Sequence, residues 1–134
     1  MTHYDIIQIK EDGKIEFPQE SAFDIGIAEG AYFLLEASPE VKELRLERIA
    51  LSDKELVEIE FVVENKPGVL SNISSILADH GVNILFNESE EVSETQAVLV
   101  TVIDVSNMDF SLEELEDRLG EREEVKEISI KKVD

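Results

Sequence analysis

The stretch that decides the fold is residues 64–84, which read ENKPGVLSNISSILADHGVNI. Its apolar side chains fall at offsets 0, 1, 4, 7 and 8 from Val69, which is the spacing of one face of an α-helix. Pro67 and Gly68 precede this helix, and Gly81 follows as its stop. The helix therefore begins at a tight turn, where the first backbone N–H groups have no partner within the helix and can receive an anion.

The segments around this helix alternate between strand and helix patterns. Residues 57–63 place apolar side chains mostly at every second position, and residues 96–103 (QAVLVTVI) are almost continuously apolar, as expected of strands. Another strand begins at Val82, and residues 125–131 form the last. A capping box at residues 111–114 opens a second helix. This βαββαβ order predicts an α+β ferredoxin-like domain, an antiparallel sheet with both helices on one face.

The strand at residues 96–103 carries apolar side chains on both of its faces. One face holds Ala97, Leu99 and Ile103, and the other holds Val98, Val100 and Val102. Because helices cover only one face of such a sheet, the valine face needs a second cover. We expect either another subunit or the first segment of the chain to supply it.

The motif NKPGVL at residues 65–70, followed by the helix and by GVNI at residues 81–84, resembles the ACT domain. ACT domains are regulatory modules, often attached to enzymes of amino-acid metabolism, and pairs of them bind a free amino acid at their interface. The resemblance implies that residues 54–134 form an ACT-like domain with this role.

The resemblance also implies which residues contact the ligand. They are Asn65, Lys66, Pro67, Gly68, Val69, Leu70, Asn83 and Ile84. The amides of Asn65 and Asn83 offer donors and acceptors to an amino acid's carboxylate and ammonium, and the resemblance implies that Asn83 reaches across a subunit interface. The alternative is that Asn65 is an ordinary turn residue and that Asn83 bonds backbone at a strand edge.

A carboxylate is the anion expected at the helix start. A phosphate lacks the charge it needs there, because Lys66 is the one basic residue of the turn and the chain has no Gly-x-x-x-x-Gly-Lys-Ser/Thr loop. Serine-binding ACT domains of phosphoglycerate dehydrogenase are similar here but carry histidine at the position of Val63. This difference points to a ligand more apolar than serine. Replacing Asn65 by alanine is expected to weaken binding while changing the stability of the ligand-free protein little.

Residues 1–53 are expected to form a separate small β domain. Turn signals divide it into strands at residues 4–10, 14–17, 31–37 and 42–49, with a helical turn at residues 19–24. Four short strands bury little by themselves, which predicts dimerisation. The succession DGKI, FP, IGI, EG and FLLE within residues 12–36 resembles the swapped-hairpin domain of the AbrB/SpoVT type, which forms an interlocked dimer. DNA-binding members carry several arginines on this hairpin, whereas this chain has none before Arg45.

The composition disfavours several classes of partner. The 134 residues include 12 basic and 32 acidic side chains, a net charge of −20, which repels nucleic acid and anionic membrane surfaces. Residues 1–53 contribute 5 basic and 12 acidic side chains, net −7, and residues 54–134 contribute 7 and 20, net −13. The chain has no cysteine and no apolar run of the roughly 18 to 20 residues that a membrane span needs. A cytoplasmic protein is expected.

The sequence offers no catalytic constellation. Only His3 and His80 could act as bases at neutral pH, and the glutamate runs lack the spacing of a calcium loop. We therefore expect no enzyme activity, no metal and no cofactor. The predicted function is a regulatory homodimer or tetramer that binds an amino acid between its ACT-like domains. The alternatives are a DNA-binding transcriptional regulator and a structural or regulatory subunit of a metabolic enzyme.

Overall fold

The computed structural model describes residues 2–133, so Met1 and Asp134 lie outside the described part of the chain. The chain divides into two compact units, Met1–Asp53 and Lys54–Asp134.

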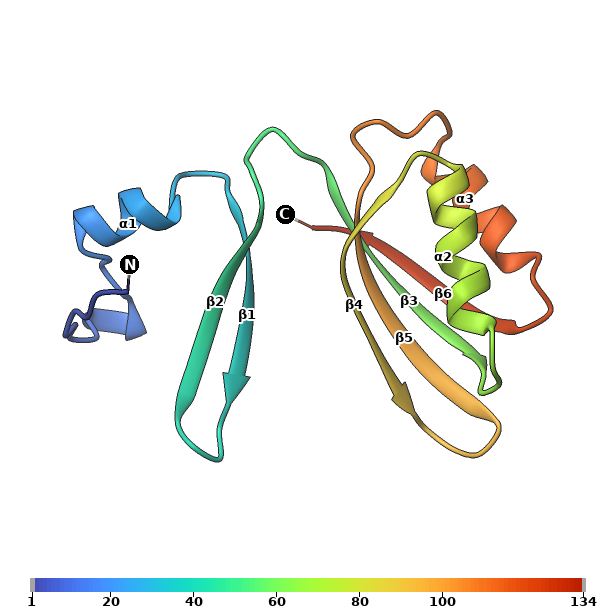
Figure 1. Cartoon of the computed structure of the whole chain (residues 1–134), viewed down its shortest axis with the longest axis horizontal. Coiled ribbons are helices and arrows are strands. Elements are labelled where there is room, and N and C mark those ends of the chain that lie inside the picture. Colours follow the sequence, from blue (N-terminus) through green and yellow to red (C-terminus); the bar gives the residue numbers. More distant parts are fainter. Residues whose placement is uncertain (1, 134) are drawn as a thin grey trace. The chain divides into compact units, whose positions relative to one another are not determined.

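The second unit consists of four strands and two helices. They are β3 (Leu56–Glu64), α2 (Val69–Asp79), β4 (Asn83–Glu91), β5 (Gln96–Asp104), α3 (Leu112–Gly120) and β6 (Val125–Lys132). The strands form one antiparallel sheet in the order β4-β5-β3-β6, and α2 and α3 cover one of its faces (Figure 1). The predicted α+β ferredoxin-like domain is confirmed.

The central strands β3 and β5 determine which side chains face the helices. They run opposite each other without a register shift, from Leu56 beside Asp104 to Glu64 beside Gln96. Directly opposed residues of an antiparallel pair share a face, so the side chains of β3 and β5 that point to the helices lie side by side.

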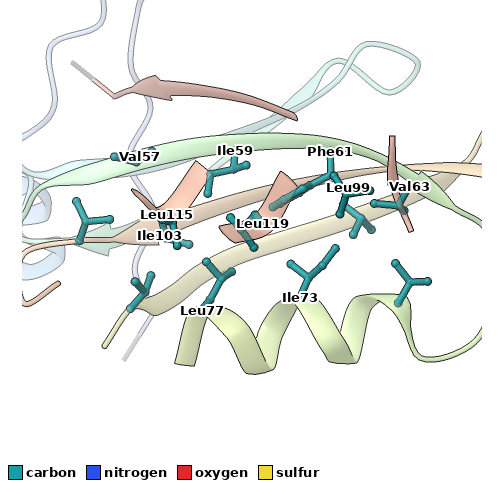
Figure 2. Close-up of a cluster of buried hydrophobic side chains, with 14 of the residues drawn as sticks. Val57, Ile59, Phe61, Val63, Ile73, Leu77, Leu99, Ile103, Leu115 and Leu119 are labelled. Atoms are coloured by element: carbon teal, nitrogen blue, oxygen red, sulfur yellow. The ribbon is translucent and has the colours of Figure 1, made fainter. Parts of the chain in front are cut away.

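The core fills the space between this face and the two helices. Ile59 and Phe61 of β3 are fully buried there, as are Leu77 of α2 and Leu119 of α3. Figure 2 shows Leu77 and Ile73 pointing from α2 toward the sheet. Each such side chain contributes about 1.5 to 3 kcal/mol by leaving water, so this core is what holds α2 and its turn in place.

The other face of β5 carries three half-buried valines, as predicted. They are Val98, Val100 and Val102. In β3 they lie opposite Val62, Glu60 and Glu58, so the apolar stripe is bordered by acidic side chains. The cover expected for this face stays a prediction.

The first unit contains one hairpin and one short helix. The hairpin pairs β1 (Tyr32–Ser38) with β2 (Glu43–Ala50) in antiparallel orientation. A single helical turn, η1 (Glu11–Gly13), and the helix α1 (Gln19–Ile25) precede it. The later two predicted strands and the helical turn are thus confirmed to within one residue at each end.

The strands predicted at residues 4–10 and 14–17 are wrong for the single chain, because both segments lack regular structure. The tight turn between them is nevertheless present. Asp12 and Gly13 have φ values of 60° and 74°, and Lys10 N donates to Lys14 O at 2.8 Å. An isolated two-stranded ribbon buries too little apolar surface to hold its strands together, which explains a turn without strands.

None of the described residues 2–53 is buried. Ile6 is fully exposed, and Tyr4 and Phe23 are 92% and 87% exposed. The first unit therefore has no core of its own within a single chain.

Candidate ligand-binding site

The turn before α2 positions the helix start as the sequence predicts. Gly68 has a φ of 88°, in the left-handed region that glycine adopts without strain, and it is the N-cap of α2. A Cβ at this position would meet nothing within 4 Å, so the backbone conformation rather than crowding requires glycine here. No side chain caps the helix start, which leaves its N–H groups to water or to a ligand.

Hydrogen bonds from Asn65 join this turn to the hairpin formed by β4 and β5. Its Nδ2 donates to Glu91 Oε1 at 2.8 Å and to Ser93 O at 3.1 Å. Its backbone N donates to Thr95 O at 3.0 Å. The amide nitrogen is thus committed within the protomer, while Oδ1 is the atom that Asn65 can offer to a ligand as an acceptor.

Glu64 is the centre of a small charged cluster beside Asn65. Its Oε2 lies 2.7 Å from Lys66 Nζ, and its Oε1 lies 3.0 Å from Lys126 Nζ. Hydrogen bonds from Lys66 and then Lys126 hold the pKa of Glu64 below its usual value, and the carboxylate in turn raises the pKa of Lys66.

A shallow depression of about 480 Å³ opens at this cluster. It is lined by Glu64, Asn65, Lys66, Glu94, Thr95, Gln96 and Lys126. The volume is in the range of small-molecule sites, although the lining is more highly charged than is usual for them. Two of the lining residues, Asn65 and Lys66, belong to the predicted site.

The remaining predicted residues of the turn have different surroundings. Val69 is 4% exposed and belongs to the core, so its side chain holds α2 rather than facing a ligand. Leu70, the next residue, is 40% exposed beside the helix start. Pro67 is also exposed.

Asn83 and Ile84 lie at the opposite end of the sheet from Asn65. Asn83 is exposed at the start of β4 and pairs with Asp104, the last residue of β5, whereas Asn65 bonds the residue just before β5. The length of β5 separates the two ends by roughly 26 Å at 3.3 Å per residue. Within one protomer, the two asparagines cannot contact the same amino acid.

The side chain of Val63 does not line the depression. It is 2% exposed and belongs to the core. Within one protomer, Val63 therefore gives no support to a ligand more apolar than serine, because its side chain packs under the helices. The identity of the ligand stays a prediction.

Five residues that line the depression lie outside the predicted set, namely Glu64, Glu94, Thr95, Gln96 and Lys126. Lys126 is far from the turn in sequence and reaches it because β6 lies beside β3, where Val63 pairs with Val125. The only sequence signal was the predicted topology, which places the last strand of a ferredoxin-like sheet beside the first.

The other titratable candidates form no second site. His80 is buried at the end of α2. Its Nδ1 lies 2.6 Å from Ile76 O, and its ring centroid lies 4.8 Å from that of Phe110, so this histidine is part of the packing at the helix end. Among residues 2–133, no three histidine, cysteine, aspartate or glutamate side chains come together as metal ligands would. No helix in the described part of the chain is long and apolar enough to cross a membrane.

Comparison with known proteins shows which family this fold and this turn belong to. A model of the ACT domain family matches residues 57–124, half of the chain, and the chain belongs to that family. The chain is also similar to a UPF0735 ACT domain-containing protein of Thermoanaerobacter sp. (strain X514), with 24% identity over 123 residues. The alignment covers 92% of this chain and 80% of the relative. The similarity therefore extends over most of residues 1–53, although the AbrB/SpoVT resemblance of that segment stays a prediction.

Proposed function

We propose that this protein is a non-enzymatic regulator that binds an amino acid between the ACT domains of two copies of the chain. The observation that carries the proposal is the placement of the two asparagines. Asn65 and Asn83 lie at opposite ends of one sheet, so a small ligand can contact both only if one comes from each of two subunits. Membership of the ACT domain family supports a regulatory role rather than catalysis.

The ligand is proposed to bind beside the turn that precedes α2. There the Oδ1 of Asn65 can accept a hydrogen bond from the ligand's ammonium group, and Leu70, which is 40% exposed, borders the uncapped helix start. Binding then shifts an equilibrium between assemblies, or between partner-bound and free protein, by the difference in ligand affinity between the two states.

Residues 1–53 are proposed to form the second contact between subunits. Their lack of buried side chains and the exposure of Ile6 and Phe23 support this role, because a partner copy would cover this apolar surface. The segments at residues 4–10 and 14–17 would gain their strand pairing in such a dimer, as the resemblance to swapped-hairpin domains implies. A dimer or tetramer located in the cytoplasm completes the proposal.

A thermal-shift screen of the twenty amino acids, one at a time at millimolar concentration, tests ligand binding. A ligand at about a hundred times its Kd should stabilise the protein by roughly 2.7 kcal/mol. Asn83→Ala is the informative variant, because its exposed side chain makes no hydrogen bond within residues 2–133. It should leave the ligand-free melting temperature unchanged and weaken binding by about 1 to 3 kcal/mol. No stabilisation by any amino acid would contradict the proposed function.

Light scattering tests the assembly. The expected mass is at least twice the 15.1 kDa of one chain. A monomer at micromolar concentration would contradict the two-subunit site, whatever the ligand screen finds.

A second candidate function is a structural or regulatory subunit of a metabolic enzyme. The same exposed apolar surface of residues 2–53 favours it, because an enzyme could cover that surface instead of another copy. Co-purification of a stable enzyme partner, together with a ligand screen that finds no binding, would support this function over the first. DNA binding has less support, because residues 1–53 carry a net charge of −7 and no arginine before Arg45.

A further inference from the structure

We infer that Lys126, together with Lys66, binds the carboxylate of a zwitterionic amino acid without a second carboxylate, and that Glu64 faces its ammonium. This inference rests on the proposed function and adds to it a binding residue that lies outside the family motif.

The geometry places three charged groups around one small volume. Lys66 and Lys126 approach the two different oxygens of Glu64, at 2.7 Å and 3.0 Å, and all three residues line the 480 Å³ depression. Lys126 also donates to Glu123 O at 3.2 Å. An ammonium has three donors, so the third N–H of Lys126 can point to a ligand carboxylate.

The charge balance of the depression selects the class of ligand. Residues 54–134 contain 7 basic and 20 acidic side chains, yet the lining of the depression holds two of each: Lys66, Lys126, Glu64 and Glu94. A zwitterion brings one charge of each sign and can pair with both kinds of group without adding net charge. An amino acid with a second carboxylate would instead add a negative charge to a domain that already carries −13, which opposes its binding.

A purely structural role for Lys126 is the competing interpretation. The Glu64–Lys126 pair joins neighbouring strands, and exposed pairs of this kind contribute little to stability. The chain supplies a matched control, because Lys131 of β6 pairs with Glu58 of β3 at 3.4 Å, joins the same two strands and does not line the depression.

The experiment compares Lys126→Met, Lys131→Met and Lys126→Arg with the unaltered protein. The probe is whichever of the twenty amino acids stabilises the unaltered protein most, and calorimetric titration gives its Kd. Lys126→Met should weaken binding roughly 10- to 100-fold, because it removes a hydrogen bond between the ammonium of Lys126 and the carboxylate of the ligand. Lys131→Met should change the Kd less than about twofold, and Lys126→Arg should retain most of the affinity.

The ligand-free melting temperatures separate the two roles. The inference requires that Lys126→Met and Lys131→Met leave this temperature nearly equal while only the former loses affinity. Equal affinity of both variants for the probe would overturn the role of Lys126 but leave the proposed function intact. Strongest stabilisation by aspartate or glutamate would overturn the inferred ligand class. If no amino acid stabilises the unaltered protein, the proposed function fails and this inference fails with it.

Discussion

Replacing Asn65 by alanine tests whether the turn before α2 is held to the β4–β5 hairpin by one side chain. The substitution removes the two hydrogen bonds that Nδ2 donates, to Glu91 Oε1 at 2.8 Å and to Ser93 O at 3.1 Å. Both acceptors lie in exposed positions, so water replaces the lost donor and no buried group is left unpaired. The bond to the charged Glu91 is the stronger one in principle, but exposure to solvent reduces its contribution.

In contrast to the small change expected from the sequence, we expect a loss of about 1 to 2 kcal/mol in the free energy of unfolding. The two hydrogen bonds that Nδ2 donates are the reason, since a net hydrogen bond contributes about 0.5 to 1.5 kcal/mol. For a domain of under about 100 residues this corresponds to roughly 4 to 8 °C of melting temperature per kcal/mol. Urea unfolding of the ligand-free protein, followed by circular dichroism, gives the free energy directly. Asn107→Ala is the matched control, because Asn107 is exposed and its side chain makes no hydrogen bond within residues 2–133.

Asn65→Asp sharpens the test by keeping the shape of the side chain. At pH 7 it places a carboxylate against that of Glu91 and should destabilise the protein more than alanine does, with recovery as the pH falls and the carboxylates gain protons. If Asn65→Ala stays within about 0.5 kcal/mol of the unaltered protein, as surface substitutions usually do, the side-chain clamp contributes nothing and the reasoning is refuted.

Two further substitutions test the second unit. Burial alone would raise the pKa of Asp104, but hydrogen bonds to its Oδ1 from Ser106 Oγ (2.5 Å) and Ser106 N (2.9 Å) outweigh this effect and lower the pKa. The ionised carboxylate of Asp104 therefore stabilises the fold fully above the ordinary aspartate pKa of about 3.9. This stabilisation is lost as the pH falls through the lower pKa that Asp104 has in the folded protein. Asp104→Asn should cost about 1 to 3 kcal/mol at pH 7, and equal deficits at pH 7 and pH 2.5 in urea titrations would contradict this assignment. Leu77→Ala should cost about 2 to 5 kcal/mol by denaturant unfolding, because the side chain is 0% exposed, and a loss below about 1 kcal/mol would mean that α2 is not anchored there.

The fold of residues 54–134 could be predicted because its signals are local. The helical spacing from Val69 to Leu77, the alternation along residues 57–63 and the turn glycines each reflect the geometry of a single element. Once those elements were identified, the βαββαβ order left few topologies, and the predicted one is observed. Ser111 illustrates the same point, because its Oγ accepts from Glu114 N at 3.1 Å as the capping box requires.

Local patterns were insufficient at residues 4–10 and 14–17. The alternation and the Asp12–Gly13 turn indicated a hairpin, and the turn formed, but strands need a neighbouring surface that a single chain does not provide. Strand propensity reports how well a side chain fits a half-buried sheet, so it cannot decide whether that sheet exists.

Some features of the candidate site also followed from local sequence, whereas others depended on the tertiary structure. The sequence by itself determined the turn, the uncapped helix start and the positions of Asn65 and Lys66, because these depend on neighbouring residues of one segment. Only the tertiary structure decided that Val63 faces the core, that Asn83 lies at the far end of the sheet, and that Lys126 meets Glu64 at 3.0 Å. These three facts depend on strand register and strand order, which bring together residues distant in the chain.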